Sequence, residues 1–190
     1  MTVPKSRGRP SAKLRILDAT LDVIKDLGTD RLTLDLVAER AGVSKGGLLY
    51  HFRFKEDLLK AANAHLVQRR YIARALEAKK LRPTRCRDLK AYVLASANNR
   101  ADNDGISTKM LAAGSMVDES AEPIRQYFQE RFPPFVEVAG FDCAAVVHAA
   151  TEGLWFMEML GLSPFPPEQR ERLIKKLLSM VDEVDSDIVG

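Results

Sequence analysis

The chain has 190 residues, which is enough for one hydrophobic core or for a small domain joined to a medium one. It is 46% hydrophobic and 29% charged, an ordinary balance for a globular protein. No apolar run reaches the length of about 18 residues that spans a membrane, and the polar, basic first residues do not resemble a secretory signal. We therefore expect a cytoplasmic protein without membrane contact.

The net charge of +3 hides an uneven distribution along the chain. Residues 1–100 carry 22 Lys and Arg against 10 Asp and Glu, whereas residues 101–190 carry 7 against 16. A basic half is typical of a part that meets a polyanion, although an unevenly charged, solvated surface is the alternative. The two cysteines, Cys86 and Cys143, are distant in sequence, and we expect free thiols rather than a disulfide or a zinc site.

Apolar residues recur at helical spacing throughout, and strand signals are nearly absent, which predicts an all-α fold. The expected helices cover residues 11–28, 34–41, 45–51, 55–80, 87–101, 106–117, 122–131, 141–160 and 167–184. Ser11, Thr33 and Ser44 are suited to cap the first three. The Pro133-Pro134 pair is expected to end the helix that begins at residue 122.

The second and third expected helices are joined by the tight turn Ala41-Gly42-Val43-Ser44. Gly42 tolerates the positive φ that such a turn requires, Val43 would fill the space between the helices, and Ser44 would cap the third. This is the geometry of a helix-turn-helix, whose last helix enters the major groove of DNA. The turn alone fits any hairpin of two helices equally well.

The longer stretch LTLDLVAERAGVSKGGLLYHFRFKEDLL, from Leu32 to Leu59, resembles the TetR family of bacterial transcriptional regulators. The resemblance covers residues 11–60 and includes the Thr33 cap, the Ala-Gly-Val-Ser turn and the Tyr50-His51-Phe52 end. It implies an N-terminal three-helix DNA-binding domain joined by a long helix to a C-terminal helical domain that binds a ligand and dimerises. The expected division is a basic arm (1–10), the DNA-binding domain (11–60), the C-terminal domain (61–185) and a frayed tail (186–190).

The resemblance also assigns expected DNA contacts. They are Thr33, Ser44, Lys45, Gly46, Gly47, Tyr50, His51 and Lys55. Lys45 would take a guanine edge or a phosphate. Leu49 stands where the family commonly has a tyrosine, so either Tyr50 takes over the phosphate contact or Leu49 meets a thymine methyl group. Phe54 stands where a capping serine is frequent, and that cap is therefore lost.

Two glycines in the first turn of so short a helix are unfavourable, since each costs about 1 kcal/mol relative to alanine. Against DNA, the missing side chains of Gly46 and Gly47 would let the backbone approach the groove, so Gly47→Leu is expected to keep the fold and weaken DNA binding. Upstream, Arg7 and Arg9 flank Gly8 in a segment that resembles the AT-hook core. They are expected in the minor groove or on phosphate, with a disordered solubilising tail as the alternative.

The C-terminal half carries no motif of its own, and its expected roles come from the resemblance. Small and apolar positions on the last two helices are expected at a four-helix dimer interface: Ala145, Ala149, Gly153, Leu173, Leu177, Met180 and Val181. A ligand pocket is expected among Met110, Met116, Tyr127, Phe128, His148, Glu152, Trp155, Phe156 and Met159. For each of the aromatic and methionine residues a place in the core is the favoured alternative, and for His148 and Glu152 the alternative is a satisfied buried pair. His148 and Glu152 lack a third metal ligand, so no metal site is expected.

These observations predict a sequence-specific transcriptional regulator, in the simplest form a ligand-responsive repressor that binds a palindromic operator as a homodimer. The expected partners are double-stranded DNA, a second copy of the chain and a largely apolar small molecule, without a cofactor, and the protein would join the nucleoid when bound to DNA. One alternative is a DNA-binding dimer without small-molecule input. An all-α enzyme that uses His148 with Glu152 or Cys143 is disfavoured, because no complete catalytic set is visible.

Overall fold

The computed structural model describes residues 11–98, 106–110 and 119–186, and within these ranges every regular element is a helix. The all-α prediction is therefore confirmed. The elements are α1 (Ala12–Leu27), α2 (Leu34–Ala41), α3 (Lys45–His51), α4 (Lys55–Ala78), α5 (Arg87–Asn98), the 3₁₀ turn η1 (Glu119–Ala121), α7 (Glu122–Ala139), α8 (Phe141–Met159) and α9 (Pro167–Ser186). Residues 106–110 are also helical.

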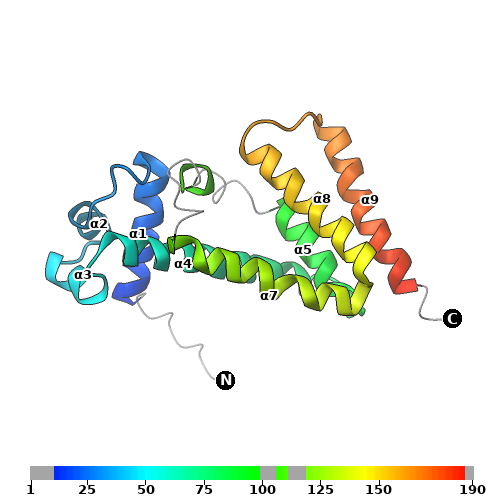
Figure 1. The fold of residues 1–190 in the computed structure, drawn as a ribbon, viewed down its shortest axis with the longest axis horizontal. Coiled ribbons are helices and arrows are strands. Elements are labelled where there is room, and N and C mark those ends of the chain that lie inside the picture. Colours follow the sequence, from blue (N-terminus) through cyan, green and yellow to red (C-terminus); the bar gives the residue numbers. More distant parts are fainter. Residues whose placement is uncertain (1–10, 99–105, 111–118, 187–190) are drawn as a thin grey trace, which may run out of the picture.

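The helices gather into two groups that α4 connects (Figure 1). At one end α1 packs against α2, α3 and the start of α4. From there α4 runs beside α7 toward the other end, where α5, α8 and α9 pack on one another. None of the helices in the described ranges combines the length and the apolar character needed to cross a bilayer.

The start of each of the first three helices is fixed by a hydroxyl side chain. Ser11, Thr33 and Ser44 each accept a hydrogen bond from the backbone N–H three residues further on, at 3.1–3.3 Å. Gly42 ends α2 in the left-handed region, at φ 61° and ψ 44°. The three caps and the turn glycine expected from the sequence are thus confirmed. The left-handed conformation of Gly42 reverses the chain between α2 and α3, as in a helix-turn-helix.

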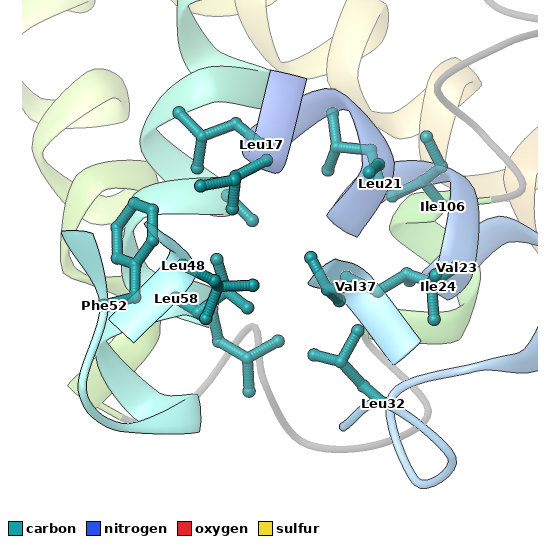
Figure 2. Packing of buried hydrophobic residues seen from close by; sticks show 14 of the residues in the cluster. Leu17, Leu21, Val23, Ile24, Leu32, Val37, Leu48, Phe52, Leu58 and Ile106 are labelled. Carbon is teal, nitrogen blue, oxygen red and sulfur yellow. The ribbon is translucent and has the colours of Figure 1, made fainter. Parts of the chain in front are cut away.

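Each group of helices has its own apolar core. The first is built from Ile16, Leu17, Leu21, Val23, Ile24, Leu32, Val37, Leu48, Phe52, Leu58 and their neighbours (Figure 2). Ile106 and Met110 also belong to it, so a segment distant in sequence closes this core. The second core is formed by α5, α7, α8 and α9, around Leu89, Tyr92, Phe135, Val147, Leu177 and Val181.

The expected helix end at Pro133-Pro134 is wrong, because α7 continues through both prolines to Ala139. Proline removes a backbone donor, which leaves the carbonyl groups of residues 129 and 130 without their helical partners. Both prolines and both of those residues are exposed, so water can satisfy these carbonyl groups. The opposite side of the same turns is held by the buried Arg131 and Phe135, which keep the helix in place.

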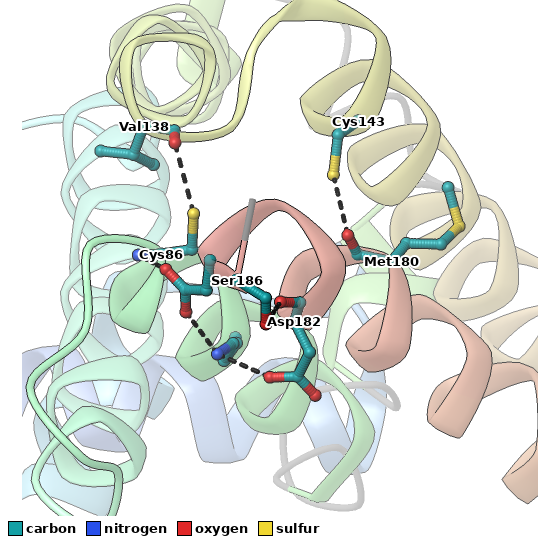
Figure 3. Close-up of polar contacts among 8 residues, drawn as sticks. Cys86, Val138, Cys143, Met180, Asp182 and Ser186 are labelled. Atoms are coloured by element: carbon teal, nitrogen blue, oxygen red, sulfur yellow. Dashed lines mark hydrogen bonds and ion pairs between the residues drawn. The ribbon is translucent and has the colours of Figure 1, made fainter. Parts of the chain in front are cut away.

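The N-terminus of α5 is tied to the C-terminal turns of α9 (Figure 3). Asp185 accepts from the backbone N–H of Cys86 at 2.9 Å, and the Lys90 ammonium bridges Asp185 and Asp182. Burial alone would raise the pKa of Asp185. Hydrogen bonds from Lys90, Thr84 and Cys86 outweigh it and hold the pKa at about 2, well below the ordinary 3.8.

Both cysteines are free thiols, as expected. The Cys86 thiol donates to the carbonyl of Val138, and the Cys143 thiol to that of Met180 (Figure 3). Burial, and then the charge of Asp185, raise the pKa of Cys86 to about 11, so this thiol stays protonated at neutral pH. Its role is to pack and to donate a hydrogen bond, since the reactive form of cysteine is the thiolate.

Candidate nucleic-acid interface and internal cavity

Helix α3 is anchored by one side and presents the other to solvent. Leu48 is completely buried and Phe52 nearly so, and Val43 packs against the same core from the turn. On the opposite side Ser44, Lys45, Gly46 and Tyr50 are exposed, with 85% of Tyr50 accessible. A seven-residue helix held this way presents a rigid surface of polar groups and bare backbone, which suits insertion into a groove.

The two glycines of α3 differ in their surroundings. A Cβ atom added at Gly46 would meet nothing within 4 Å, so the chain itself gives no reason for glycine there. A Cβ atom added at Gly47 would lie 3.2 Å from the Oγ of Ser44, the oxygen that caps the helix. Gly47 therefore has a reason within the fold, whereas the fold of the single chain does not require glycine at position 46.

Lys45, the first residue of α3, forms an ion pair with Asp35 of α2 at 2.9 Å. About two thirds of each side chain is exposed, so the pair is worth at most about 1 kcal/mol. A phosphate or a base edge can therefore compete for the ammonium group. Asp35 lies on the same surface and would repel a nearby phosphate, so it limits how strongly this surface attracts nucleic acid without sequence preference.

Some of the other expected DNA contacts already form contacts within the chain. Thr33 caps α2 through its oxygen and still has its hydroxyl proton to donate. Lys55 already donates to the backbone carbonyl of Thr29 at 2.7 Å, which anchors the α1–α2 connection to α4. His51 packs edge-on against Tyr50, and Leu49 is half-buried. Arg7 and Arg9 lie outside the described residues.

The excess positive charge lies mostly outside the helix-turn-helix unit. Residues 11–60 carry nine Lys and Arg and eight Asp and Glu, whereas residues 61–100 carry ten and two. The positive charge of the N-terminal half therefore lies mainly in residues 61–100, which include the second half of α4 and the α4–α5 connection. The N-terminal arm, residues 1–10, adds to it. Residues 11–60 as a whole are thus nearly neutral, so bulk charge alone would give this unit little attraction for a polyanion.

A small cavity lies beside the middle of α4. Its lining comes from α4 (Asn63, Leu66, Val67, Arg70), the helical segment 106–110 (Ser107, Met110), α7 (Ile124, Tyr127, Phe128) and α8 (Trp155). The cavity has a volume of about 20 Å³, which is room for about one water molecule. It is therefore nearly closed in this conformation.

The structure brings four of the expected pocket residues to this cavity: Met110, Tyr127, Phe128 and Trp155. It places four others elsewhere. His148 and Glu152 belong to a neighbouring polar cluster, Met159 is buried without lining the cavity, and Phe156 is exposed. Met116 lies outside the described residues.

The polar cluster beside the cavity is centred on Arg131, whose side chain is 99% buried. Its guanidinium group pairs with Glu152 at 3.1 Å and lies over the rings of Tyr92, Tyr127 and Phe128. The hydroxyl of Tyr92 donates to Glu152 and also contacts Nδ1 of His148.

The environment fixes the protonation states of this cluster. Burial, and then the charge of Glu152, raise the pKa of Tyr92 well above its ordinary value. Burial, and then the charge of Arg131, lower the pKa of His148. At neutral pH His148 and Tyr92 are therefore neutral, and the contacts among Arg131, Glu152, Tyr92 and His148 join α5, α7 and α8 in one polar network. The described residues also contain no group of three side chains suited to hold a metal ion.

Two of the expected dimer contacts are corrected by burial. Leu177 is 2% exposed and Val181 is fully buried within the second core of a single chain, so neither is free to meet a partner. Both face α5 and α8, because α9 packs there with its broad apolar side. The other positions keep some exposure in the single chain: Ala145, Ala149, Gly153, Leu173 and Met180.

Sequence reasoning missed Arg70, which lines the cavity, and Arg131, which lies over two of its aromatic residues. The spacing of Tyr127, Phe128, Arg131 and Phe132 would have signalled an arginine on the aromatic side of α7. No local pattern marks Arg70, because its environment depends on how α4 meets α8 across a separation of 85 positions in the chain.

Comparison with known proteins agrees with this geometry. The family model described as "Bacterial regulatory proteins, tetR family" matches residues 16–62, and the one described as "Tetracyclin repressor-like, C-terminal domain" matches residues 87–182. The HTH-type transcriptional regulator BetI of Cronobacter sakazakii is 30% identical over 111 residues, 58% of this chain and 54% of that protein. BetI of Klebsiella pneumoniae is 39% identical over 59 residues, 31% of this chain and 30% of its own length.

Solved structures share the fold over nearly the whole chain. A TetR family member from Streptomyces coelicolor A3 has a TM-score of 0.68 at 18% identity, over 90% of this chain and 98% of that one. The multidrug binding protein EbrR, complexed with malachite green, has a TM-score of 0.68 at 19% identity over the same shares. These likenesses concern the fold, whereas the matches to curated relatives cover about half of their length or less.

The helix-turn-helix unit and the two family models together identify the class of protein. This chain belongs to the tetR family of bacterial regulatory proteins, which are transcription factors and not enzymes. The resemblance found in residues 11–60 is thereby confirmed and extends to the C-terminal half.

Proposed function

We propose that this protein is a ligand-responsive repressor that binds a palindromic operator as a homodimer. It would act in the cytoplasm and associate with the nucleoid when bound to DNA. The observation that carries the DNA-binding part is the exposed side of α3, where Gly46 presents bare backbone beside Ser44, Lys45 and Tyr50. A surface of this kind has no purpose in the packing of the chain, and it lies where a helix-turn-helix meets the major groove.

We propose that DNA binding and ligand binding belong to different parts of the chain, each built around one of the two cores. Residues 11–60 would read DNA, with residues 1–10 as a basic arm, and residues 61–185 would bind ligand and dimerise. Ser44, Lys45, Gly46 and Gly47 would enter the groove. Thr33, Tyr50, His51 and Lys55 would hold phosphates, and Leu49 would contact a thymine methyl group.

Dimerisation is supported by the unusual composition of α8. This helix is apolar nearly all round, and a helix with apolar residues on every side is normally buried on every side. In the single chain Val147 and Leu154 face the interior, but Val146 is 50% exposed and Phe156 is 44% exposed. A second copy packed on this side of α8 would cover these two side chains. The α3 helix of each copy would then contact one half-site of the DNA.

A response to ligand is supported by the helical segment 106–110, which contacts both the cavity and the DNA-reading unit, residues 11–60. We call residues 11–60 the reading unit. Met110 lines the cavity and at the same time belongs to the core of the reading unit. Lys109 donates hydrogen bonds to the carbonyl groups of Lys25 and Asp26 in the last turn of α1, and Ile106 packs beside Val23 and Ile24 (Figure 2). A ligand that enlarges the cavity must move this segment, and with it α1, so ligand and DNA would favour different conformations.

The test uses DNA sites selected by the protein from a random library, with affinity measured by fluorescence anisotropy at fixed salt. Lys45→Ala and Tyr50→Ala are expected to weaken binding to the selected site at least tenfold. The matched control is Lys79→Ala, an exposed lysine in the α4–α5 connection, which removes the same charge far from α3. Equal losses in Lys45→Ala and Lys79→Ala would show that the contact is only general electrostatic attraction.

A further inference from the structure

Arg70 is the only charged residue that lines the cavity among the described parts of the chain. Its guanidinium carbon lies 4.5 Å from the centre of the Trp155 ring, and the side chain is half-buried. None of the carboxylates in the described ranges lies within ion-pair distance of it. The nearby Glu152 is already engaged by Arg131 and Tyr92. Arg70 is therefore a positive group that faces an apolar space without a counter-charge.

The aromatic walls of the same cavity are poorly suited to a cation. Rings that recognise a cationic ligand offer their faces to it. Here Arg70 covers a face of Trp155, and Arg131 lies 4.3 Å and 4.5 Å from the ring centres of Tyr127 and Phe128. All three aromatic residues that line the cavity are thus already paired with a guanidinium group. A cationic ligand would have to displace these arginines and would be repelled by their charge.

We propose that the effector is an apolar organic acid whose carboxylate pairs with Arg70. Its hydrocarbon body would lie against the apolar lining, chiefly Leu66, Val67 and Ile124. Arg70 matches a carboxylate because the guanidinium group can donate two parallel hydrogen bonds to it. This inference rests on the proposed ligand response and adds the chemical class of the ligand.

The size of the cavity dictates how such a molecule enters. Room for about one water molecule does not hold a hydrocarbon chain, so a side chain of the lining must move. Met110 is unbranched and adaptable, and it stands between the cavity and the core of the reading unit. Binding of the acid would therefore displace the segment that connects the cavity to α1.

The experiment uses Trp155, the only tryptophan of the chain, as a fluorescent reporter in the DNA-free protein. Two carbon skeletons are titrated, 4-phenylbutyl and decyl, each as the carboxylate, the primary alcohol and the primary ammonium ion. The malachite green cation is added as a further probe, because EbrR binds it. For at least one skeleton the carboxylate is expected to change the Trp155 emission saturably and to bind at least tenfold more tightly than the alcohol and the ammonium ion.

Variants separate the role of Arg70 from general effects of charge. Arg70→Gln is expected to abolish the preference for the carboxylate, Arg70→Lys to keep part of it, and Arg69→Gln to leave it unchanged. Thermal melting of each variant establishes that the fold is intact. The proposal is overturned if no carboxylate binds, if alcohol, ammonium ion or malachite green binds as tightly as the acid, or if Arg70→Gln keeps the preference.

A separate titration in the presence of selected DNA distinguishes the ligand class from the proposed function. Saturating acid is expected to weaken DNA binding by the unmodified protein and not by Arg70→Gln. If the acid binds with the expected preference but does not change the affinity for DNA, the proposed ligand class is supported and the proposed ligand response is contradicted. If DNA binding is absent from the start while the acid binds, the regulator function fails independently of the ligand.

Discussion

Gly46 and Gly47 stand in the same turn of α3 for different reasons. A side chain at Gly47 would crowd the hydroxyl of Ser44 that caps the helix, so this glycine serves the fold as well as the surface. A side chain at Gly46 would extend into open space, where the intact chain offers it no contact. Gly47→Leu would therefore press on the Ser44 cap as well as change the exposed surface, whereas Gly46→Leu would change the exposed surface alone.

Gly46→Leu separates stability from DNA binding. Leucine is about 1 kcal/mol better than glycine in a helix, so the melting temperature is expected to stay the same or to rise. The added side chain would stand between the backbone and the groove, so affinity for the selected site is expected to fall at least tenfold in fluorescence anisotropy.

The matched control for this variant is Ala64→Leu, which adds a leucine at an exposed position of α4. It is expected to leave DNA affinity unchanged. If Gly46→Leu binds DNA as the unmodified protein does, the backbone of α3 does not approach the groove at this position.

At the scale of the element, most helix ends follow from residues that act within one turn. Ser11, Thr33, Ser44 and Gly42 could be assigned in advance because a cap or a positive φ is a local property. The continuation of α7 through Pro133 could not, since it depends on the burial of neighbouring residues against other helices and on water at the freed carbonyl groups. A local rule fails where tertiary packing decides the outcome.

The tie between α5 and α9 predicts a specific dependence of stability on pH. The pKa of Asp185 is held at about 2 in the fold, below its ordinary 3.8, so ionised Asp185 stabilises the fold above about pH 4. This contribution, about 2 kcal/mol, is lost as the pH falls toward 2. Asp185→Asn is therefore expected to lower the free energy of unfolding by about 2 kcal/mol at pH 7, and by progressively less between pH 4 and pH 2.

Urea unfolding followed by circular dichroism measures this effect across the pH range. The control is Asp182→Asn, which removes the more exposed partner of Lys90 and is expected to cost under about 1 kcal/mol. Equal costs for the two variants, or a cost for Asp185→Asn that does not change with pH, would show that the ion pair and the cap at Cys86 do not stabilise the fold as described.

At the scale of the whole molecule, the fold and the position of the helix-turn-helix could be predicted, whereas the cavity could be predicted only in part. Thr33, Lys45 and Tyr50 lie within one continuous stretch whose pattern is typical of a helix-turn-helix. Arg70 and Trp155 meet only after α4 and α8 have packed, and Leu177 could be assigned to the core rather than to a dimer interface only once its neighbours were known. Residues that act across the chain leave no local pattern.

The exposed apolar side of α8 predicts the oligomeric state. Val146→Glu would place a charge in the proposed contact between two copies, and it is expected to convert a dimer into a folded monomer in analytical ultracentrifugation at micromolar concentration. Ile72→Glu makes a similar change on an equally exposed residue of α4 and is expected to leave the dimer intact. A dimer that survives Val146→Glu would place the interface on another side of the chain.

The central claim is that two copies of α3 read two half-sites of one DNA duplex. Selection of binding sites from random double-stranded DNA by the unmodified protein tests it most directly. We predict enrichment of an inverted repeat with half-site centres about one helical turn or a multiple of it apart, and no enrichment of that repeat by Gly46→Leu. Enrichment of an unpaired motif, or of no motif at all, would contradict this account.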